Sequence, residues 1–139
     1  MDFWGPRMWK IMHQVSYCYS DNPDEELKKV FGFFYLTIIP KIIPCNKCRR
    51  HYLANLQTFP PRLKNKRKLT RWVVDVHNEV NKSKSKPVVS YEFAEQLYRD
   101  QSFPTEIKQL TLYFQKRVAY RKLSITTFQN YCQFIKRLT

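Results

Sequence analysis

Apolar side chains recur at spacings of three and four residues along most of the sequence, and this periodicity constrains the fold more than any other feature. Such stripes predict helices over residues 6–20, 24–40, 44–57, 69–83, 90–100, 104–119 and 124–138. Only two of the 139 residues are glycine, which argues against an all-β chain rich in tight turns. No stretch reads convincingly as a strand, and the sequence predicts an all-α helical bundle.

Two local features refine these helices. Pro40 should kink or end the second helix, because proline lacks the N–H group that a helix interior needs. In the third helix, Tyr52, Leu53 and Leu56 are the candidates for burial, and the basic stretch 59–68 that follows is predicted to be a loop. The stripe of the last helix includes Ile125 and Cys132, which predicts a buried structural thiol at Cys132.

Length and composition fit one ordinary globular domain, since 43% of the residues are hydrophobic. The N-terminus lacks the apolar stretch of a signal peptide, and the most apolar run is broken by Lys41 and two prolines, so we expect no membrane span. The formal net charge of +14 has two readings: solvated helix faces, or a surface that attracts nucleic acid, anionic membrane or acidic partners. No nucleic-acid-binding motif accompanies the charge, so no specific nucleic-acid partner is predicted.

The four cysteines are too few to build a disulfide scaffold, and two of them form the motif Cys45-Asn-Lys-Cys48. At the start of a helix, free backbone N–H groups and the helix dipole stabilise a thiolate, and one helical turn keeps two sulfurs close enough to bridge. A working dithiol is therefore one interpretation. A zinc clamp is another, with His51 as a third ligand, although structural zinc takes four.

Two further stripes carry rings and polar groups. Trp9 and His13 lie one turn apart on the first helix, and His77 and Asn81 lie one turn apart on the fourth, followed by the lysines of residues 82–86. Aromatic rings stack on a flat heterocycle, whereas His, Asn and Lys side chains bind its edges and phosphates. Each stripe alone is more typical of core and surface; together with the Cys-x-x-Cys motif they indicate a cofactor site.

These residues resemble the Erv/ALR family of FAD-linked sulfhydryl oxidases over residues 3–100. The resemblance is carried by Trp4-Gly5-Pro6 with Trp9 and His13, Pro44-Cys45-x-x-Cys48 with His51, His77-Asn78-x-Val80-Asn81 with Lys86-Pro87, and Tyr98. It implies a four-helix bundle with a short fifth helix, FAD held at the mouth of the bundle, and a homodimer. We therefore expect an FAD-binding oxidase domain in residues 1–102 and a helical C-terminal extension in residues 103–139.

The resemblance also implies roles for individual residues. Cys45 would meet the dithiol of a client protein, such as a thioredoxin-like or virion protein, and Cys48 would pass electrons to the flavin. Dioxygen would then reoxidise the flavin and give hydrogen peroxide. The implied FAD-binding residues are Gly5, Trp9, His13, His51, His77, Asn78, Val80, Asn81, Lys82, Lys86 and Tyr98. Among these, Trp9 and His77 would pack on the adenine, and Lys82 and Lys86 would offset negative charge.

The departures from the family pattern are also informative. Lys68 and Tyr91 stand where many cellular members have a structural disulfide, and no pair of shuttle cysteines occurs. This minimal form looks most like the oxidases of large cytoplasmic DNA viruses, which implies a task in virion assembly in the host cytoplasm, within viral factories, and presence in the virion. The apolar stripes beyond Pro104 suggest either a dimer or client surface or an extra packing layer. The rival interpretation is a basic helical module that binds zinc or nucleic acid and has no redox activity.

Overall fold

The computed structural model describes residues 3–99 and 104–138, and these form helices without any strand. The predicted all-α fold class is therefore confirmed. The elements are α1 (Trp4–Tyr17), α2 (Glu25–Phe33), the π-helical segment η1 (Phe34–Ile38), α3 (Ile39–Ile42), α4 (Asn46–Thr58), α5 (Lys66–Ser83), α6 (Tyr91–Tyr98), α7 (Pro104–Ala119) and α8 (Ile125–Leu138). No helix in the described ranges is long and apolar enough to cross a bilayer.

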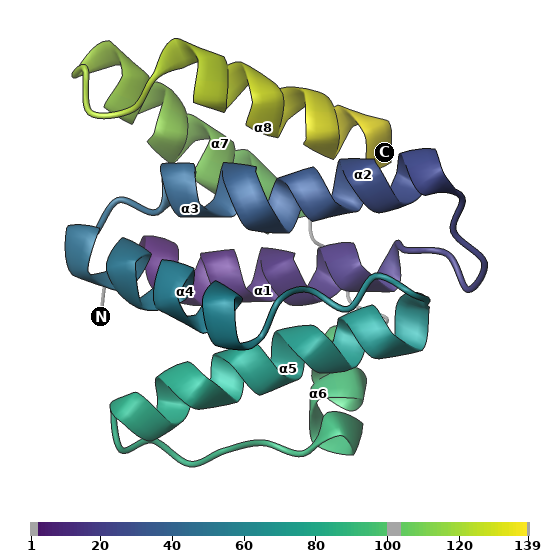
Figure 1. Ribbon diagram of the computed structural model, residues 1–139. Coiled ribbons are helices and arrows are strands. Elements are labelled where there is room, and N and C mark those ends of the chain that lie inside the picture. The colour runs from purple at the N-terminus through teal and green to yellow at the C-terminus, as the bar shows by residue number, and fades with distance from the viewer. Residues whose placement is uncertain (1–2, 100–103, 139) are drawn as a thin grey trace.

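Helix α1 lies in the middle of the bundle. It packs against α5 and α6 on one side and against α7 on another, so that helices from both ends of the sequence meet around it (Figure 1). The predicted stripe of α1 is confirmed, because Met8, Ile11, Met12 and Val15 are all buried. A helix that contributes to the core on several sides has little freedom to move, so the side chains it directs toward α5 are held in place.

The second predicted helix continues through Pro40 instead of ending there. Asp24 caps its start by accepting a hydrogen bond from the backbone N–H of Leu27 at 2.8 Å. The wider η1 segment then precedes α3, and Pro40 falls at the beginning of α3, where the missing N–H is tolerated. The helical path therefore extends to Ile42, and the chain turns only at residues 43–45, directly before the Cys-x-x-Cys motif.

The predicted start of the fourth helix and the predicted loop before it need correction. The side-chain oxygen of Asn65 accepts a hydrogen bond from the N–H of Lys68 at 2.9 Å, so α5 begins at Lys66 and takes up the end of the basic stretch. Ser90 caps α6 in the same manner through the N–H of Phe93. Polar caps thus set both helix starts, whereas apolar periodicity alone placed one of them three residues too late.

Helices α7 and α8 form a layer over α1 and η1 (Figure 1). The ring of Phe134 stacks on Phe34 with centroids 4.2 Å apart, and Lys10 pairs with Glu106 at 2.8 Å. The apolar side chains that this layer contributes to the common core are Leu110, Phe114, Tyr131, Phe134 and Ile135. The extension therefore has the packing of an extra layer. The proposed domain boundary between residues 102 and 103 lies outside the described residues.

Three predictions of burial from periodicity are wrong or only partly right. Leu53 is 42% exposed and Ile125 is 54% exposed, although both lie on apolar stripes. Cys132 is only half-buried, at the margin of the core. Spacing places each of these residues on the correct side of its helix, but exposure depends on whether a neighbouring helix covers that position.

Candidate functional site

The Cys-x-x-Cys motif lies at the beginning of α4, as the sequence predicts. Cys45 is the capping residue, and its sulfur accepts a hydrogen bond from the backbone N–H of Cys48 at 3.2 Å. The carbonyl of Cys45 accepts the N–H of Arg49 at 2.9 Å, which closes the first turn. The N–H of Cys48 in the first turn of α4 thus points toward the sulfur of Cys45, and the N-terminal end of a helix favours negative charge.

The side chain of Arg49 fixes the turn that presents Cys45. Its guanidinium donates to the carbonyl of Pro40 at 2.7 Å and to that of Ile43 at 2.5 Å, and it also donates to the side chain of Asn46 at 3.0 Å. These bonds join the end of α3 to the beginning of α4. Nothing in the sequence pattern shows the two carbonyls that Arg49 holds.

Cys48 faces the interior of the bundle. It lines a cavity of about 70 Å³ between α1, α4 and the end of α5. The other lining residues are Trp4, Gly5, Met8, Trp9, Met12, Ile43, His51, Tyr52, Val80 and Lys84. Of the predicted cofactor residues, the cavity therefore brings together Gly5, Trp9, His51 and Val80 with the second cysteine of the motif.

A group of four rings from α1, α5 and α6 adjoins this cavity. Trp9 and His77 stack with centroids 4.0 Å apart and planes 3° apart, and His13 and Tyr98 stack at 4.1 Å and 4°. The two pairs are joined by a hydrogen bond of 2.9 Å between Nε2 of His13 and Nδ1 of His77. Rings at these distances are in van der Waals contact, so they form one continuous aromatic wall.

The two histidines of this wall are held in the neutral form. Burial, followed by the positive charges of Lys86 and Lys84, lowers the pKa of His77 to about 4. Burial and the neighbouring His77 place the pKa of His13 well below its usual value. Because both rings are neutral near pH 7, one nitrogen of the bond between them donates and the other accepts.

Two asparagines near the end of α5 hold the loop that follows the helix. Asn78 ties the loop before α6 to α5: its amide donates to the carbonyl of Val89 at 2.8 Å and its oxygen accepts the N–H of Val89 at 3.0 Å. The amide of Asn81 donates to the side chain of Asn78 at 3.4 Å, and its carbonyl accepts the N–H of Lys86 at 2.8 Å. Here both asparagines position a loop.

The lysines of this loop differ in what they approach. Lys84 lines the cavity beside Cys48. The family resemblance implies Lys82 and Lys86, not Lys84, as FAD-binding residues. Lys82 is exposed and pairs with Glu79 at 3.4 Å, and Lys86 is exposed but close enough to affect the pKa of His77. Lys84 is the residue directly after the end of α5, and the sequence does not show which of the three lysines reaches the cavity.

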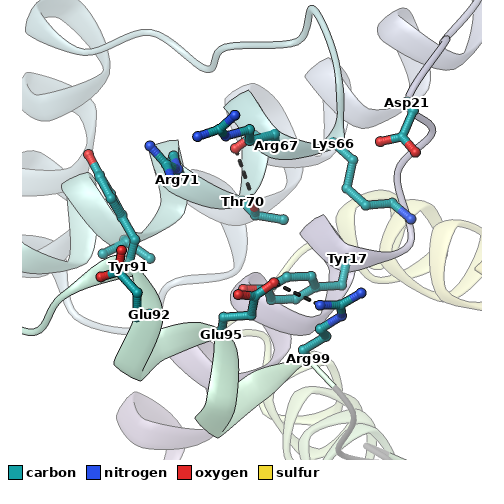
Figure 2. A pocket seen from close by; sticks show the side chains of 11 residues that line it. Tyr17, Asp21, Lys66, Arg67, Thr70, Arg71, Tyr91, Glu92, Glu95 and Arg99 are labelled. Carbon is teal, nitrogen blue, oxygen red and sulfur yellow. Dashed lines mark hydrogen bonds and ion pairs between the residues drawn. The ribbon is translucent and has the colours of Figure 1, made fainter.

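A second cavity, of about 530 Å³, lies where α1, α5 and α6 meet, beyond the ring group (Figure 2). Its charged residues include Lys66, Arg67 and Arg71 of α5 together with Glu92 and Glu95 of α6. Figure 2 shows the ion pair between Glu95 and Arg99, whose nitrogen and oxygen lie 2.9 Å apart. None of the predicted cofactor residues lines this cavity, and both signs of charge occur in it.

Comparison with known proteins places this architecture. A family model described as the Erv1/Alr family matches residues 6–103, and that range contains the motif, the aromatic wall and α6. The chain belongs to the Erv1/Alr family. Helices α7 and α8 lie beyond the match, so the layer that they add is outside the part that Erv1/Alr proteins share.

Relatives of known name occur in cells and in viruses. The chain is 30% identical to the mitochondrial FAD-linked sulfhydryl oxidase ERV1 of Saccharomyces cerevisiae over 69% of its own length, but spans only 50% of the length of that protein. It is 29% identical to an FAD-linked sulfhydryl oxidase of African swine fever virus, with 73% of this chain and 85% of the viral protein covered. A probable FAD-linked sulfhydryl oxidase of Acanthamoeba polyphaga mimivirus is 33% identical over 63% of either chain.

Solved structures agree with this Erv1/Alr assignment. The crystal structure of the FAD-binding domain of yeast Erv1 superposes with a TM-score of 0.66 at 30% identity, covering 72% of this chain and 96% of that domain. Within residues 3–99 and 104–138, no three His, Cys, Asp or Glu side chains gather in a way that could hold a metal ion.

Proposed function

We propose that this protein is an FAD-linked sulfhydryl oxidase that forms disulfide bonds in client proteins. The observation that carries the proposal is the position of Cys48, which opens on the cavity beside the Trp9–His77 stack while Cys45 lies at the helix start. The names of the viral and cellular relatives support the same activity.

The side chains around the cavity fit the chemical groups of FAD. Trp4, Trp9 and Met8 offer apolar surface to a flat ring system, and Lys84 with Lys86 offers positive charge to a diphosphate. Because the rings of Trp9 and His77 stack directly on each other, a ring of FAD could pack on the outer face of either one but could not enter between them. When bound, FAD supplies an electron acceptor that dioxygen can reoxidise, with hydrogen peroxide as the product.

The proposed cofactor residues then have distinct tasks. Gly5, Trp9, His51 and Val80 would contact FAD from the cavity walls, and His13, His77 and Tyr98 would hold the aromatic wall in position. Asn78 and Asn81 would act by fixing the loop that carries the lysines, in addition to any direct contact. Lys82 and Lys86 would contribute positive potential from the exposed surface.

The two cysteines would carry out the exchange with the client. A client thiolate attacks the sulfur of Cys45 in the Cys45–Cys48 disulfide, and the second client thiol then displaces Cys45. The client dithiol loses two electrons and two protons as its disulfide forms. The Cys45–Cys48 pair takes up those two electrons and two protons, and its cavity-facing member, Cys48, is the one that would hand electrons on.

We further propose that the clients are virion proteins, that the protein works in the cytoplasm of an infected cell, and that it forms a homodimer. Support for a viral setting comes from the African swine fever virus and mimivirus relatives. Light scattering on the purified protein tests the homodimer, and the disulfide state of virion proteins without this protein tests the client class.

The decisive experiment is the visible absorption spectrum before and after anaerobic dithiothreitol, for the wild type and for Cys48→Ser. A flavin band that bleaches in the wild type, returns in air and bleaches poorly in Cys48→Ser is the expected result. The matched control is Cys132→Ser, whose half-buried sulfur lies on α8 and should leave the response unchanged. A colourless protein that retains zinc would overturn the oxidase and favour the rival metal-binding module.

A further inference from the structure

A groove lies along the side of α4 adjacent to the one that lines the cofactor cavity. Its volume is about 730 Å³, and it is formed by η1 and α3, by α4 and by the turn that joins α7 to α8. The lining residues are Leu36, Thr37, Pro40, Lys41, Arg49, Leu53, Lys122, Leu123, Ser124 and Thr127. Four of these lie beyond the family match, and Lys41 and Arg49 lie on either side of the turn at residues 43–45, so the extension and the oxidase domain share this groove.

The lining combines apolar side chains with positive charge only. Leu36 is 46% exposed and Leu53 is 42% exposed, an unusual exposure for two large apolar residues in one depression. The charged lining residues are Lys41, Arg49 and Lys122, and no acidic side chain joins them. In the described part of the chain, neither Lys41 nor Lys122 forms an ion pair, so their charges face solvent without compensation.

The groove also continues the side of α4 that begins with Cys45. Arg49 follows Cys45 by four residues and Leu53 follows it by eight, a spacing that keeps residues along one side of a helix. Cys48 and Tyr52 follow the adjacent stripe and line the cofactor cavity instead. Cys48 therefore lines the cofactor cavity, and Cys45, the cap of α4, precedes the stripe that lines the groove.

We propose that this groove docks the segment of the client that carries the substrate dithiol, and that this segment contains acidic and large apolar side chains. The inference rests on the proposed oxidase function and names the class of substrate that it acts on. Leu36, Leu53 and Leu123 supply apolar contacts, and Lys41 and Lys122 attract carboxylates and position the client dithiol next to Cys45.

Two other occupants fit the groove less well. None of its lining residues is aromatic, whereas single-stranded nucleic acid is held by aromatic side chains that stack on bases. A second copy of this chain would bring its own excess of positive charge, because the formal net charge is +14, toward a basic rim. An acidic protein segment complements both the leucines and the lysines.

The test uses the holoprotein and a set of short synthetic dithiol peptides. One peptide carries Cys-x-x-Cys followed by alternating leucine and aspartate, and matched peptides replace aspartate by lysine or leucine by serine. Oxidation is followed by loss of thiols, with dithiothreitol as the small substrate that needs no groove. Binding is measured separately by fluorescence anisotropy, on labelled peptides in which serine replaces both cysteines.

The key variant combines Lys41→Glu with Lys122→Glu. The control variant combines Lys64→Glu with Lys108→Glu, which makes the same change in net charge at exposed lysines that line none of the described cavities. For the wild type we expect kcat/KM to favour the aspartate peptide. In the key variant kcat/KM for that peptide should fall about tenfold to twentyfold, since each exposed ion pair contributes up to about fivefold. The lysine peptide should then become the better substrate, and dithiothreitol oxidation should stay unchanged.

Leu36→Ser gives an independent measure of the apolar contacts. It should raise KM for the leucine peptides and leave KM for the serine-substituted peptide and for dithiothreitol unchanged. Salt should weaken the preference for aspartate and leave the effect of Leu36→Ser unchanged, because salt screens charges but not apolar contacts.

The outcomes separate this inference from the proposed function. If dithiothreitol is oxidised but all peptides react alike in every variant, the groove is not the client site and the oxidase stands. If no dithiol is oxidised yet the blocked aspartate peptide binds and is released by the charge reversal, the groove binds acidic apolar segments, and both the oxidase and the docking of a substrate dithiol are overturned. The docking of a client is also overturned if the charge reversal leaves the peptides unaffected and only abolishes binding of an oligonucleotide. The same holds if it leaves the peptides unaffected and only splits a dimer in light scattering.

Discussion

The packing of α8 leads to a quantitative prediction about Phe134. The ring is 5% exposed, stacks on Phe34 at 4.2 Å and meets Phe31 edge to face at 5.4 Å. Phe34 and Phe31 belong to the part of the chain that matches the Erv1/Alr family, whereas Phe134 lies beyond it. The substitution Phe134→Ala therefore tests whether the extension and the oxidase domain share one core.

The expected loss follows from the contacts that disappear. Truncation of a buried phenylalanine to alanine costs about 3–5 kcal/mol, and total stability of a domain is about 5–15 kcal/mol. With about 4 °C of melting temperature per kcal/mol for a chain of this size, the midpoint should fall by about 12–20 °C. The loss includes the apolar area of the ring and its favourable stacking on Phe34.

The assay is thermal and denaturant unfolding of the holoprotein, followed both by circular dichroism and by the fluorescence of released flavin. Gln129→Ala on the exposed side of α8 is the matched control and should change the midpoint little. Both signals should shift together in Phe134→Ala. The reasoning is refuted if Phe134→Ala behaves like the control, or if α8 unfolds in a separate early transition while flavin release keeps its wild-type midpoint.

Two further predictions concern the wall beside the cavity. Asn78→Ala should destabilise the protein by about 2 kcal/mol in urea titrations and weaken FAD retention, because two hydrogen bonds to Val89 are lost; an unchanged stability would show that the loop needs no such anchor. Because the pKa of His77 is lowered from 6.5 to about 4, the unfolded chain binds a proton in that interval that the folded protein does not. At about 1.4 kcal/mol per pKa unit, up to about 3 kcal/mol of stability should be lost as pH falls through this window, and His77→Gln should flatten the dependence of unfolding free energy on pH.

The helices could be predicted from sequence because their apolar spacing is locally encoded. The position of Cys45 at a helix start was predictable for the same reason, since Pro44 precedes a new stripe. Helix limits were less accurate, because the cap at Asn65 and the π-helical segment before Pro40 depend on single side chains and on local backbone adjustment. Periodicity reports the average over a helix, whereas a cap is decided by one hydrogen bond.

The sequence predicts which residues form the site, and the structure adds contacts among them that the sequence does not show. Trp9 and His77 lie far apart in the sequence, and their direct stacking arises because α1 packs on α5. Asn78 is predicted at the cofactor, and its side chain also holds the loop at Val89, whose path the sequence does not specify. Lys84 follows the last residue of α5, Ser83, and lines the cavity. The lysines at alternate positions of residues 82–86 look alike in the sequence, which does not show which of them lies there.

The two cysteines precede two adjacent stripes of α4, one of which lines the cofactor cavity and the other the groove. Residues three apart on a helix differ by about 60° around its axis, close enough for two sulfurs to bridge and far enough for them to begin adjacent stripes. The stripe after Cys48 continues to Tyr52 in the cofactor cavity, and the stripe after Cys45 continues to Leu53 in the groove. In the proposed relay, Cys45 exchanges with the client at the start of α4, and Cys48 lies beside the cofactor cavity.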